Sequence, residues 1–265
     1  CIRDSYYTGL FPFGDGSSNN LSYTVALSRN NTFTNPIFPL GGSEFVLSAR
    51  FSLPYSLWNG VDYANLGDLE KFQDDDGNPD PAKIEQEKFK WLEFYKIKFK
   101  GSWYTRLFDK LVLRTHTEFG FLGAFNNDRG VIPFDRFFLG GDGMSQYAMD
   151  GRETISLRGY PNQSLSSQDG STIYNRFSLE LRYPITLKPA ASIFGLTFME
   201  TGQGYNNFRE FNPFNGKRSV GLGLRIFMPA FGLLGIDFGY GLDSVNEFNL
   251  EPNGWETHFV IGQQF

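Results

Sequence analysis

Few residues in this chain have the types and spacing that could do chemistry. An acidic segment between residues 74 and 85 places oxygen-bearing side chains at positions 1, 3, 5, 7 and 12 of a calcium-binding loop. These side chains belong to Asp74, Asp76, Asn78, Asp80 and Glu85. Pro79 stands at the sixth position, where such a loop needs glycine for its sharp turn. We therefore favour a solvated surface loop that turns through Gly77 and Pro79 over a metal site.

Other reactive chemistry has less support. Two histidines, His116 and His258, and a single cysteine exclude a metal cluster, a redox pair and a disulfide framework within the chain. The glycines at Gly202–Gly204 and Gly221–Gly223 do not open a helix after a strand, as a dinucleotide-binding turn must. No Gly-x-Ser-x-Gly elbow with a histidine base marks a hydrolase. The sequence therefore predicts neither an enzyme nor a cofactor.

Composition narrows the class of protein. Among 265 residues, 24 basic side chains stand against 29 acidic ones, and the net charge of −5 argues against a nucleic-acid binder. The mean hydropathy is −0.32, and apolar runs fall short of the ~18 residues that a membrane-spanning helix needs. The 29 Phe and 30 Gly residues instead fit strands with one lipid-facing side and one wet side, which keep average hydropathy low.

Apolar residues alternate with polar or small ones along most of the chain, with the period of a β-strand. The alternating segments are Leu21–Leu27, Phe45–Leu53, Tyr95–Phe99, Leu111–Phe121, Phe177–Tyr183, Val220–Ile226, Leu234–Leu242 and Phe259–Phe265. Their second face carries glycine, serine and charges, as the lumen of a barrel does. The pattern predicts an all-β protein, an antiparallel transmembrane β-barrel, with a helix expected only around Pro81–Lys90.

Connections between these strands alternate in length. Arg106–Lys110, Lys188–Ser192 and Pro229–Gly232 are short, whereas Asp62–Lys88, Asn126–Ile173, Gly202–Lys217 and Asp243–Glu256 are long and polar. Outer-membrane barrels keep short turns in the periplasm and long loops outside. The pattern therefore predicts an integral outer-membrane protein whose C-terminal Phe265 faces the periplasm. On this assignment the Asn30–Gly42 connection is periplasmic and long for that side.

Motifs along the chain resemble those of a known family. Pro133–Tyr160 reads PFDRFFLGGDGMSQYAMDGRETISLRGY and is similar to the BamA-type outer-membrane assembly barrels (the outer-membrane protein insertion porin family), in which a long loop ends in an Arg-Gly-aromatic tip. Further matches follow in order: NRFSLELRYP (Asn175–Pro184), LTFMETG (Leu196–Gly202), SVGLGLRIFMP (Ser219–Pro229) and the terminal THFVIGQQF. Asn35–Leu57 and the DGRE at Asp150–Glu153 look most like the Bacteroidetes branch of this Gram-negative family.

The resemblance implies an architecture. Family members carry N-terminal periplasmic repeats and then a 16-stranded barrel, whereas we count about nine or ten strands here, at ~10 residues each. Residues 1–265 are therefore expected to be the C-terminal portion of the barrel, without the periplasmic repeats and the first barrel strands. A long inward-folding loop is expected at residues 126–173 and the closing strand at residues 256–265.

The resemblance also implies a site. In relatives the Arg-Gly-aromatic tip folds into the lumen, where its arginine meets acidic residues of neighbouring strands. The matching tip is Arg158, Gly159 and Tyr160, and the matching acids are Glu180 and Glu200, the latter standing where relatives more often have Asp. A guanidinium can bridge two carboxylates in a partly desolvated lumen. The alternative is that these are separate, hydrated lumen charges.

The end of the chain resembles the family's closing-strand signal, carried here by Thr257, Phe259, Ile261, Gly262 and Phe265. Family resemblance implies a weak seam beside this strand, where an incoming strand adds by β-augmentation. Phe265 is otherwise an ordinary interfacial aromatic residue.

The implied function is that of the central subunit of a β-barrel assembly (BAM) complex, which folds and inserts outer-membrane proteins. Its expected partners are nascent barrel proteins, periplasmic chaperones, accessory lipoproteins and the lipid bilayer, with no nucleic acid. Two alternatives remain open, a polypeptide-secretion pore of the same superfamily and a passive scaffold for surface lipoproteins.

Overall fold

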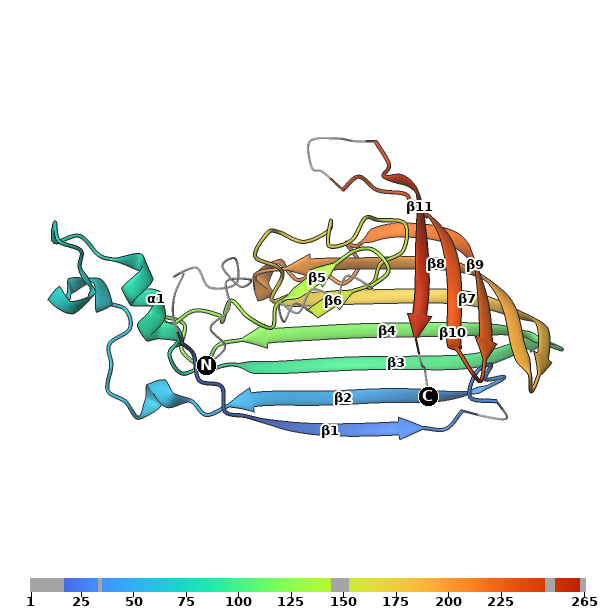
Figure 1. Cartoon of the computed structure of the whole chain (residues 1–265), viewed down its shortest axis with the longest axis horizontal. Helices are drawn as coiled ribbons and strands as arrows, with labels where there is room; N and C mark the ends of the chain where they lie inside the picture. Colours follow the sequence, from blue (N-terminus) through green and yellow to red (C-terminus); the bar gives the residue numbers. More distant parts are fainter. Residues whose placement is uncertain (1–16, 33–34, 144–152, 246–250, 263–265) are drawn as a thin grey trace.

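The computed structural model describes residues 17–32, 35–143, 153–245 and 251–262. One antiparallel sheet dominates this part of the chain, with strand order β1-β2-β3-β4-β7-β8-β9-β10-β11. Its strands are β1 (Ser22–Asn30), β2 (Gly42–Ser52), β3 (Tyr95–Phe108), β4 (Leu111–Gly123), β7 (Ile173–Lys188), β8 (Ala191–Tyr205), β9 (Lys217–Met228), β10 (Gly232–Gly241) and β11 (Gly254–Gly262). The sheet curves strongly, so that β9 to β11 cross the direction of β1 to β4, as in a partial barrel (Figure 1).

Strand register gives the sheet two chemically different faces. Along the rows that pair Glu118 with Arg176 and Ser178 with Glu200, polar side chains point to the concave face, which we call the luminal face. The intervening residues, such as Leu222 and Phe259, are exposed on the outer face. Because side chains alternate with period two, the sequence pattern placed these residues on their faces correctly.

The luminal face is apolar at the end that carries the short turns. Phe38, Tyr104, Val112, Phe194, Leu196 and Phe198 form a buried cluster there. Phe38, in the β1–β2 connection, packs edge-on against Phe194 of β8 with 5.2 Å between ring centres. The long Asn30–Gly42 connection therefore folds inward and fills this end of the lumen, which alternation alone did not reveal.

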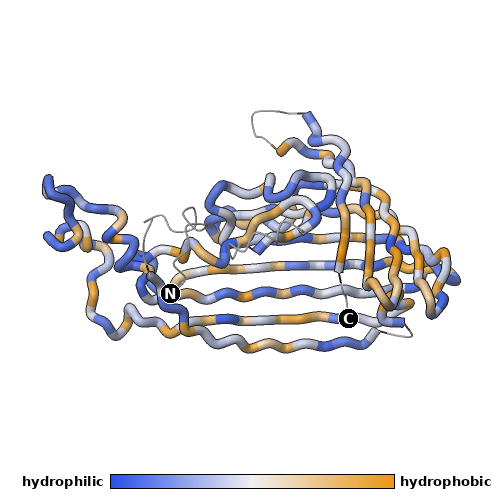
Figure 2. The backbone as a smooth tube through the Cα atoms, viewed as in Figure 1, coloured by the Kyte–Doolittle hydropathy of each residue, from blue (hydrophilic) through white to orange (hydrophobic). Residues whose placement is uncertain are grey.

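The β2–β3 connection forms a small folded unit beyond the strand ends. It contains three 3-10 helices, Tyr55–Leu57, Leu66–Asp68 and Glu70–Phe72, and the helix α1 (Pro81–Phe89), close to the range expected. Tyr63, Leu66 and Phe72 form its own core. This unit projects away from the strands and is largely hydrophilic at its tip (Figure 2). None of the helices in the described ranges is long and apolar enough to cross a membrane.

Candidate functional site

The β4–β7 connection folds back onto the luminal face. It carries a short parallel pair, β5 (Phe137–Leu139) and β6 (Glu153–Ile155), which lies within the curve of the sheet (Figure 1). Phe137 packs edge-on against Tyr174 of β7 with ring centres 4.6 Å apart. Lys96 of β3 binds Glu153 of β6 at 2.8 Å, and Lys98 binds the same carboxylate at 2.9 Å. Apolar contacts and ion pairs thus fix β5 and β6, which form the base of the loop and precede its tip in the chain.

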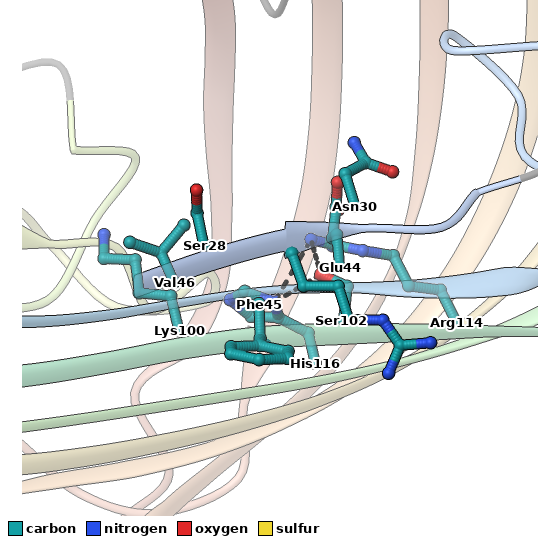
Figure 3. A pocket seen from close by; sticks show the side chains of 11 residues that line it. Ser28, Asn30, Glu44, Phe45, Val46, Lys100, Ser102, Arg114 and His116 are labelled. Atoms are coloured by element: carbon teal, nitrogen blue, oxygen red, sulfur yellow. Dashed lines mark hydrogen bonds between the residues drawn. The ribbon is translucent and has the colours of Figure 1, made fainter. Parts of the chain in front are cut away.

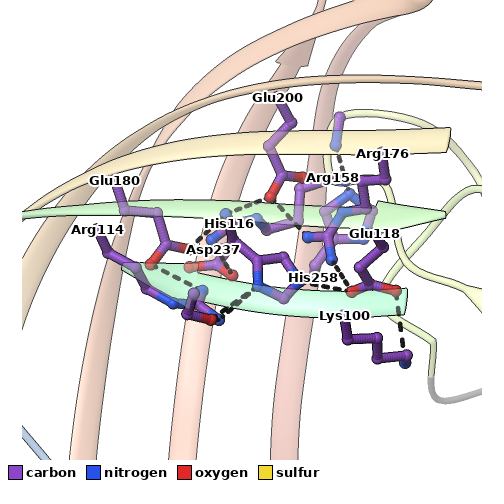
Figure 4. A network of polar contacts seen from close by, with 12 residues as sticks. Lys100, Arg114, His116, Glu118, Arg158, Arg176, Glu180, Glu200, Asp237 and His258 are labelled. Carbon is purple, nitrogen blue, oxygen red and sulfur yellow. Dashed lines mark hydrogen bonds and ion pairs between the residues drawn. The ribbon is translucent and has the colours of Figure 1, made fainter. Parts of the chain in front are cut away.

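Arg158 joins three carboxylates from three strands. Its Nη2 lies 2.7 Å from Glu180 Oε1 and 2.5 Å from Glu200 Oε1, and its Nη1 lies 3.3 Å from Asp237 Oδ2 (Figure 4). The Arg158 backbone N–H also donates to Glu200 Oε2. Its guanidinium carbon lies 3.7 Å from the centre of the Phe198 ring. The structure therefore brings the three residues expected from the sequence together and adds a fourth, Asp237.

Each of these acids also contacts an arginine from the strand wall. Glu200 binds Arg176 at 2.7 Å, and Asp237 accepts two hydrogen bonds from Arg225, at 2.7 and 2.6 Å. Glu180 accepts from Arg182 and Arg114, and Arg176 also reaches Glu118, which lies 2.7 Å from His116 Nε2. The loop arginine is thus the central cation of a buried network spanning β4 to β10 (Figure 4).

The electrostatics of the network hold Arg158 charged. Burial by itself lowers the pKa of a guanidinium, but the carboxylates of Glu200 and Glu180 outweigh it and raise the Arg158 pKa above its ordinary value. Only 6% of its side chain is exposed. A charged group this buried is stable only with its partners in place. The arrangement can therefore hold the loop in place, and the Arg158 guanidinium stays protonated.

The two residues after Arg158 are held by the last strands. Gly159 donates its N–H to His258 Nε2 at 2.9 Å and accepts from Asn253 Nδ2 at 3.0 Å. Gly159 has φ +87, a conformation that glycine adopts without strain. Tyr160 donates to the carbonyl oxygen of Arg218 at 2.6 Å, and burial raises the Tyr160 pKa to about 12. The tip therefore contacts β11 through His258.

The wall beneath the tip is built from glycine. A Cβ at Gly239 would lie 2.6 Å from Gly159 N, and a Cβ at Gly241 would lie 2.4 Å from Gly159 O. Such distances are sterically forbidden, so only glycine lets the tip backbone approach β10 this closely. The luminal glycines Gly239 and Gly241 of β10 thus make room for the loop.

The closing-strand residues lie where alternation puts them. β11 pairs with β10 along its whole length, and Asp237 stands opposite His258 in this register. Thr257, Phe259 and Ile261 are exposed on the outer face, and Gly262 ends the strand. Phe265 lies outside the described residues.

Comparison with known proteins decides the family. Residues 13–265 match the Omp85 superfamily domain. The chain belongs to the Omp85 superfamily. The fold of this Omp85 protein is similar to the crystal structure of BamA from Haemophilus ducreyi lacking POTRA domains 1–3, with a TM-score of 0.58 and 18% identity. The match covers 90% of this chain and 41% of the other, so the chain spans less than half of that protein. No curated protein matches the chain. This is an Omp85-type outer-membrane β-barrel protein.

The acidic segment of this Omp85 protein forms a turn and a helix cap. Asp74 Oδ1 accepts from the backbone N–H of Asp76 and of Asn78, and Asp80 caps α1 by accepting from the N–H groups of Ala82 and Lys83. Within the described ranges, no group of three or more His, Cys, Asp or Glu side chains could hold a metal ion. Within this spacing, which includes Glu85, Asp74 and Asp80 therefore stabilise the local backbone.

A polar hollow opens on the luminal face beside the network (Figure 3). It is lined by Ser28, Arg29, Asn30, Glu44, Phe45, Val46, Lys100, Gly101, Ser102, Arg114 and His116. Several of its polar side chains have partners: the Tyr104 hydroxyl donates to Glu44, and Ser102 Oγ lies 2.8 Å from His116 Nδ1. The hollow continues the polar wall towards β1.

Sequence reasoning missed three residues that hold the loop: Asp237, Asn253 and His258. Alternation had already placed Asp237 and His258 on the side of their strands away from the apolar residues, so both were expected to face the lumen. Their relation to Arg158 depends on strand register and on the path of the loop. A register-aware alignment of β10 with β11 would have paired these two side chains.

Proposed function

We propose that this Omp85 protein is the central barrel subunit of a BAM-type machinery that folds and inserts outer-membrane β-barrel proteins. The observation that carries the proposal is the loop tip, which is buried against acids of β7, β8 and β10 and hydrogen-bonded to His258 of β11. A loop held in this way supports the lumen directly behind the last strand.

The proposed mechanism uses backbone hydrogen bonding. A seam forms where β11 meets the first strand of the complete barrel, and a client strand adds to the exposed backbone groups there by β-augmentation. Glycine at position 262 weakens pairing at the end of β11. No bound cofactor and no hydrolysis are needed, because each client strand pair releases its own folding free energy.

The proposal includes the surroundings of the protein. Its clients are nascent outer-membrane barrels delivered by periplasmic chaperones, and accessory lipoproteins complete the complex. The strands run so that the short turns and the C-terminus face the periplasm of a Gram-negative cell, of the Bacteroidetes type by its motifs. The similarity of the fold to a solved structure of BamA supports this role.

Conditional depletion of the intact protein, followed by quantitative proteomics of the outer membrane, tests the proposal. We expect broad loss of unrelated barrel proteins. Complementation should succeed with a Lys188→Met variant, which changes the exposed last residue of β7, and fail with Arg158→Met. Loss of one exported polypeptide with other barrels intact would instead identify a secretion pore. Loss of one surface lipoprotein alone would identify a scaffold.

A further inference from the structure

The β8–β9 connection, residues 206–216, folds over the outer face of the wall. Phe121 points outward from β4, and the rings of Phe208 and Phe211 lie 6.2 and 5.6 Å from its ring centre. Tyr205, the last residue of β8, packs edge-on against Phe211 at 5.5 Å. A connection between two neighbouring strands thus extends across β7 to reach β4. We call residues 206–216 the aromatic clasp.

Polar contacts fix the clasp to the wall. Asn175 belongs to the outer face of β7, opposite Phe119 and Gln203, yet its side chain is completely buried. Its Nδ2 donates to the carbonyl oxygen of Pro213 at 3.2 Å. Tyr205 donates its hydroxyl to the carbonyl oxygen of Asn212 at 2.5 Å. An amide facing hydrocarbon without a partner costs several kcal/mol, so these bonds favour the folded-back position.

The clasp nevertheless leaves large apolar surfaces uncovered. Phe208 is 72% exposed and Phe214 is 93% exposed, although neither belongs to a strand. Below them the outer face continues through Met199 and Leu179, which are also exposed. The exposed rings therefore lie at the end of the strands that carries the long loops, beyond the lipid-facing band and past Thr201 and Gln203 on the outer face of β8. Aromatic rings are favoured at the boundary between hydrocarbon and lipid headgroups.

We propose that the aromatic clasp is a lipid-interface site, in which Phe208 and Phe214 enter the headgroup–acyl boundary of the membrane leaflet next to the long loops. Phe211 and Phe121 form the support against which the clasp rests. Asn175 and Tyr205 hold its backbone over the wall. The clasp thereby fixes the depth of β7 and β8 in the bilayer, independently of what the barrel does to its clients.

Spin labels report the depth directly. In a background in which Cys1 and every other native cysteine of the intact protein are replaced by Ser, one nitroxide is attached at F208C or F214C. The protein is reconstituted in vesicles of phosphatidylethanolamine and phosphatidylglycerol. The water-exposed control is D75C, in an exposed turn of the β2–β3 connection, and the lipid-exposed control is L222C, on the outer face of β9. Collision rates with oxygen and with a water-soluble nickel chelate are measured for each label.

We expect nickel accessibility at F208C and F214C to be several-fold lower than at D75C, and oxygen accessibility to approach that of L222C. Nickel accessibility equal to that at D75C would overturn the proposal. The exposed rings would then be candidates for contact with a protein partner instead of lipid. An Asn175→Ala variant labelled at F214C provides a second measurement, because it removes the bond to Pro213 while leaving the label site intact. Its label should move towards water; an unchanged depth would contradict the role assigned to Asn175.

Discussion

Replacing Arg158 by Met should release the loop tip from the wall. Methionine keeps an unbranched, apolar side chain that still fits beside Phe198, but it removes the cation shared by Glu180, Glu200 and Asp237. Breaking one side of a buried ion pair costs about 3–5 kcal/mol. Each acid keeps an arginine of the wall as a second partner, so the lower end, about 3 kcal/mol, applies.

This free energy corresponds to roughly a 10²-fold change in the docking equilibrium, since 1.36 kcal/mol is tenfold. The backbone N–H of Gly159, which donates to His258, reports docking through its hydrogen-exchange rate. In Arg158→Met we expect peptides covering residues 153–165 to exchange roughly 10²-fold faster in the detergent-solubilised or reconstituted protein. Lys188→Met should exchange like the wild type. A change below about threefold would refute the view that Arg158 pins the loop.

The network also predicts how charge swaps behave. Arg158→Glu combined with Glu200→Arg would place the new arginine beside Arg176, which already binds that position at 2.7 Å. A pair of like charges in a buried site is destabilising, so the swap should not restore docking. Exchange in the double variant should be at least as fast as in Arg158→Glu alone. Recovery to the wild-type rate would show that the acids act as independent pairs.

Three further predictions concern the tip. Gly239→Ala should displace it, because the new Cβ would overlap Gly159 N; overpacking costs about 1–3 kcal/mol, and exchange at the tip should rise accordingly. His258→Phe removes one hydrogen-bond acceptor of about 1 kcal/mol, so exchange should rise only several-fold, and a larger effect would give His258 a further role. The Tyr160 pKa is about 12 in the folded protein and about 10 in the unfolded chain. The neutral Tyr160 side chain therefore contributes its full stabilisation of the docked tip below about pH 10, and this contribution is lost as the pH rises through about 12. In Tyr160→Phe, the hydrogen-exchange rate of the tip, corrected for the intrinsic pH dependence of exchange, should not change with pH between about 10 and 12. A pH dependence that persists in this variant would show that another group titrates.

Much of the fold could be predicted from the sequence because the face on which a strand residue lies depends only on its position in the alternation along that strand. Alternation with period two placed His116, Glu118 and Asp237 on the luminal side without knowledge of their neighbours. A helix was also expected around Pro81–Lys90, and in the structure Asp80 caps it with Pro81 as its first residue. The calcium-type spacing is a weak signal, because turn formation and helix capping use the same side chain types as metal binding.

The inward course of the Asn30–Gly42 connection and the outward course of the aromatic clasp were not predictable in this way. Both depend on contacts between residues that are far apart in the chain, such as Phe38 with Phe194 and Phe208 with Phe121. Loop sequences carry no period that points them towards one face. Their direction is decided by which apolar surface lies within reach once the sheet has formed.

By itself, the sequence determined an antiparallel wall with one lipid-facing side, and its resemblance to BamA-type barrels pointed to the Arg158 tip together with Glu180 and Glu200. Tertiary structure alone decided that Asp237 and His258 join them, and that glycines at 239 and 241 make room for the tip. The physical reason is that periodicity fixes the direction of a side chain, whereas a buried charge network requires distances of about 3 Å between atoms. Those distances are set only when the curved sheet brings β7, β8, β10 and β11 around one loop.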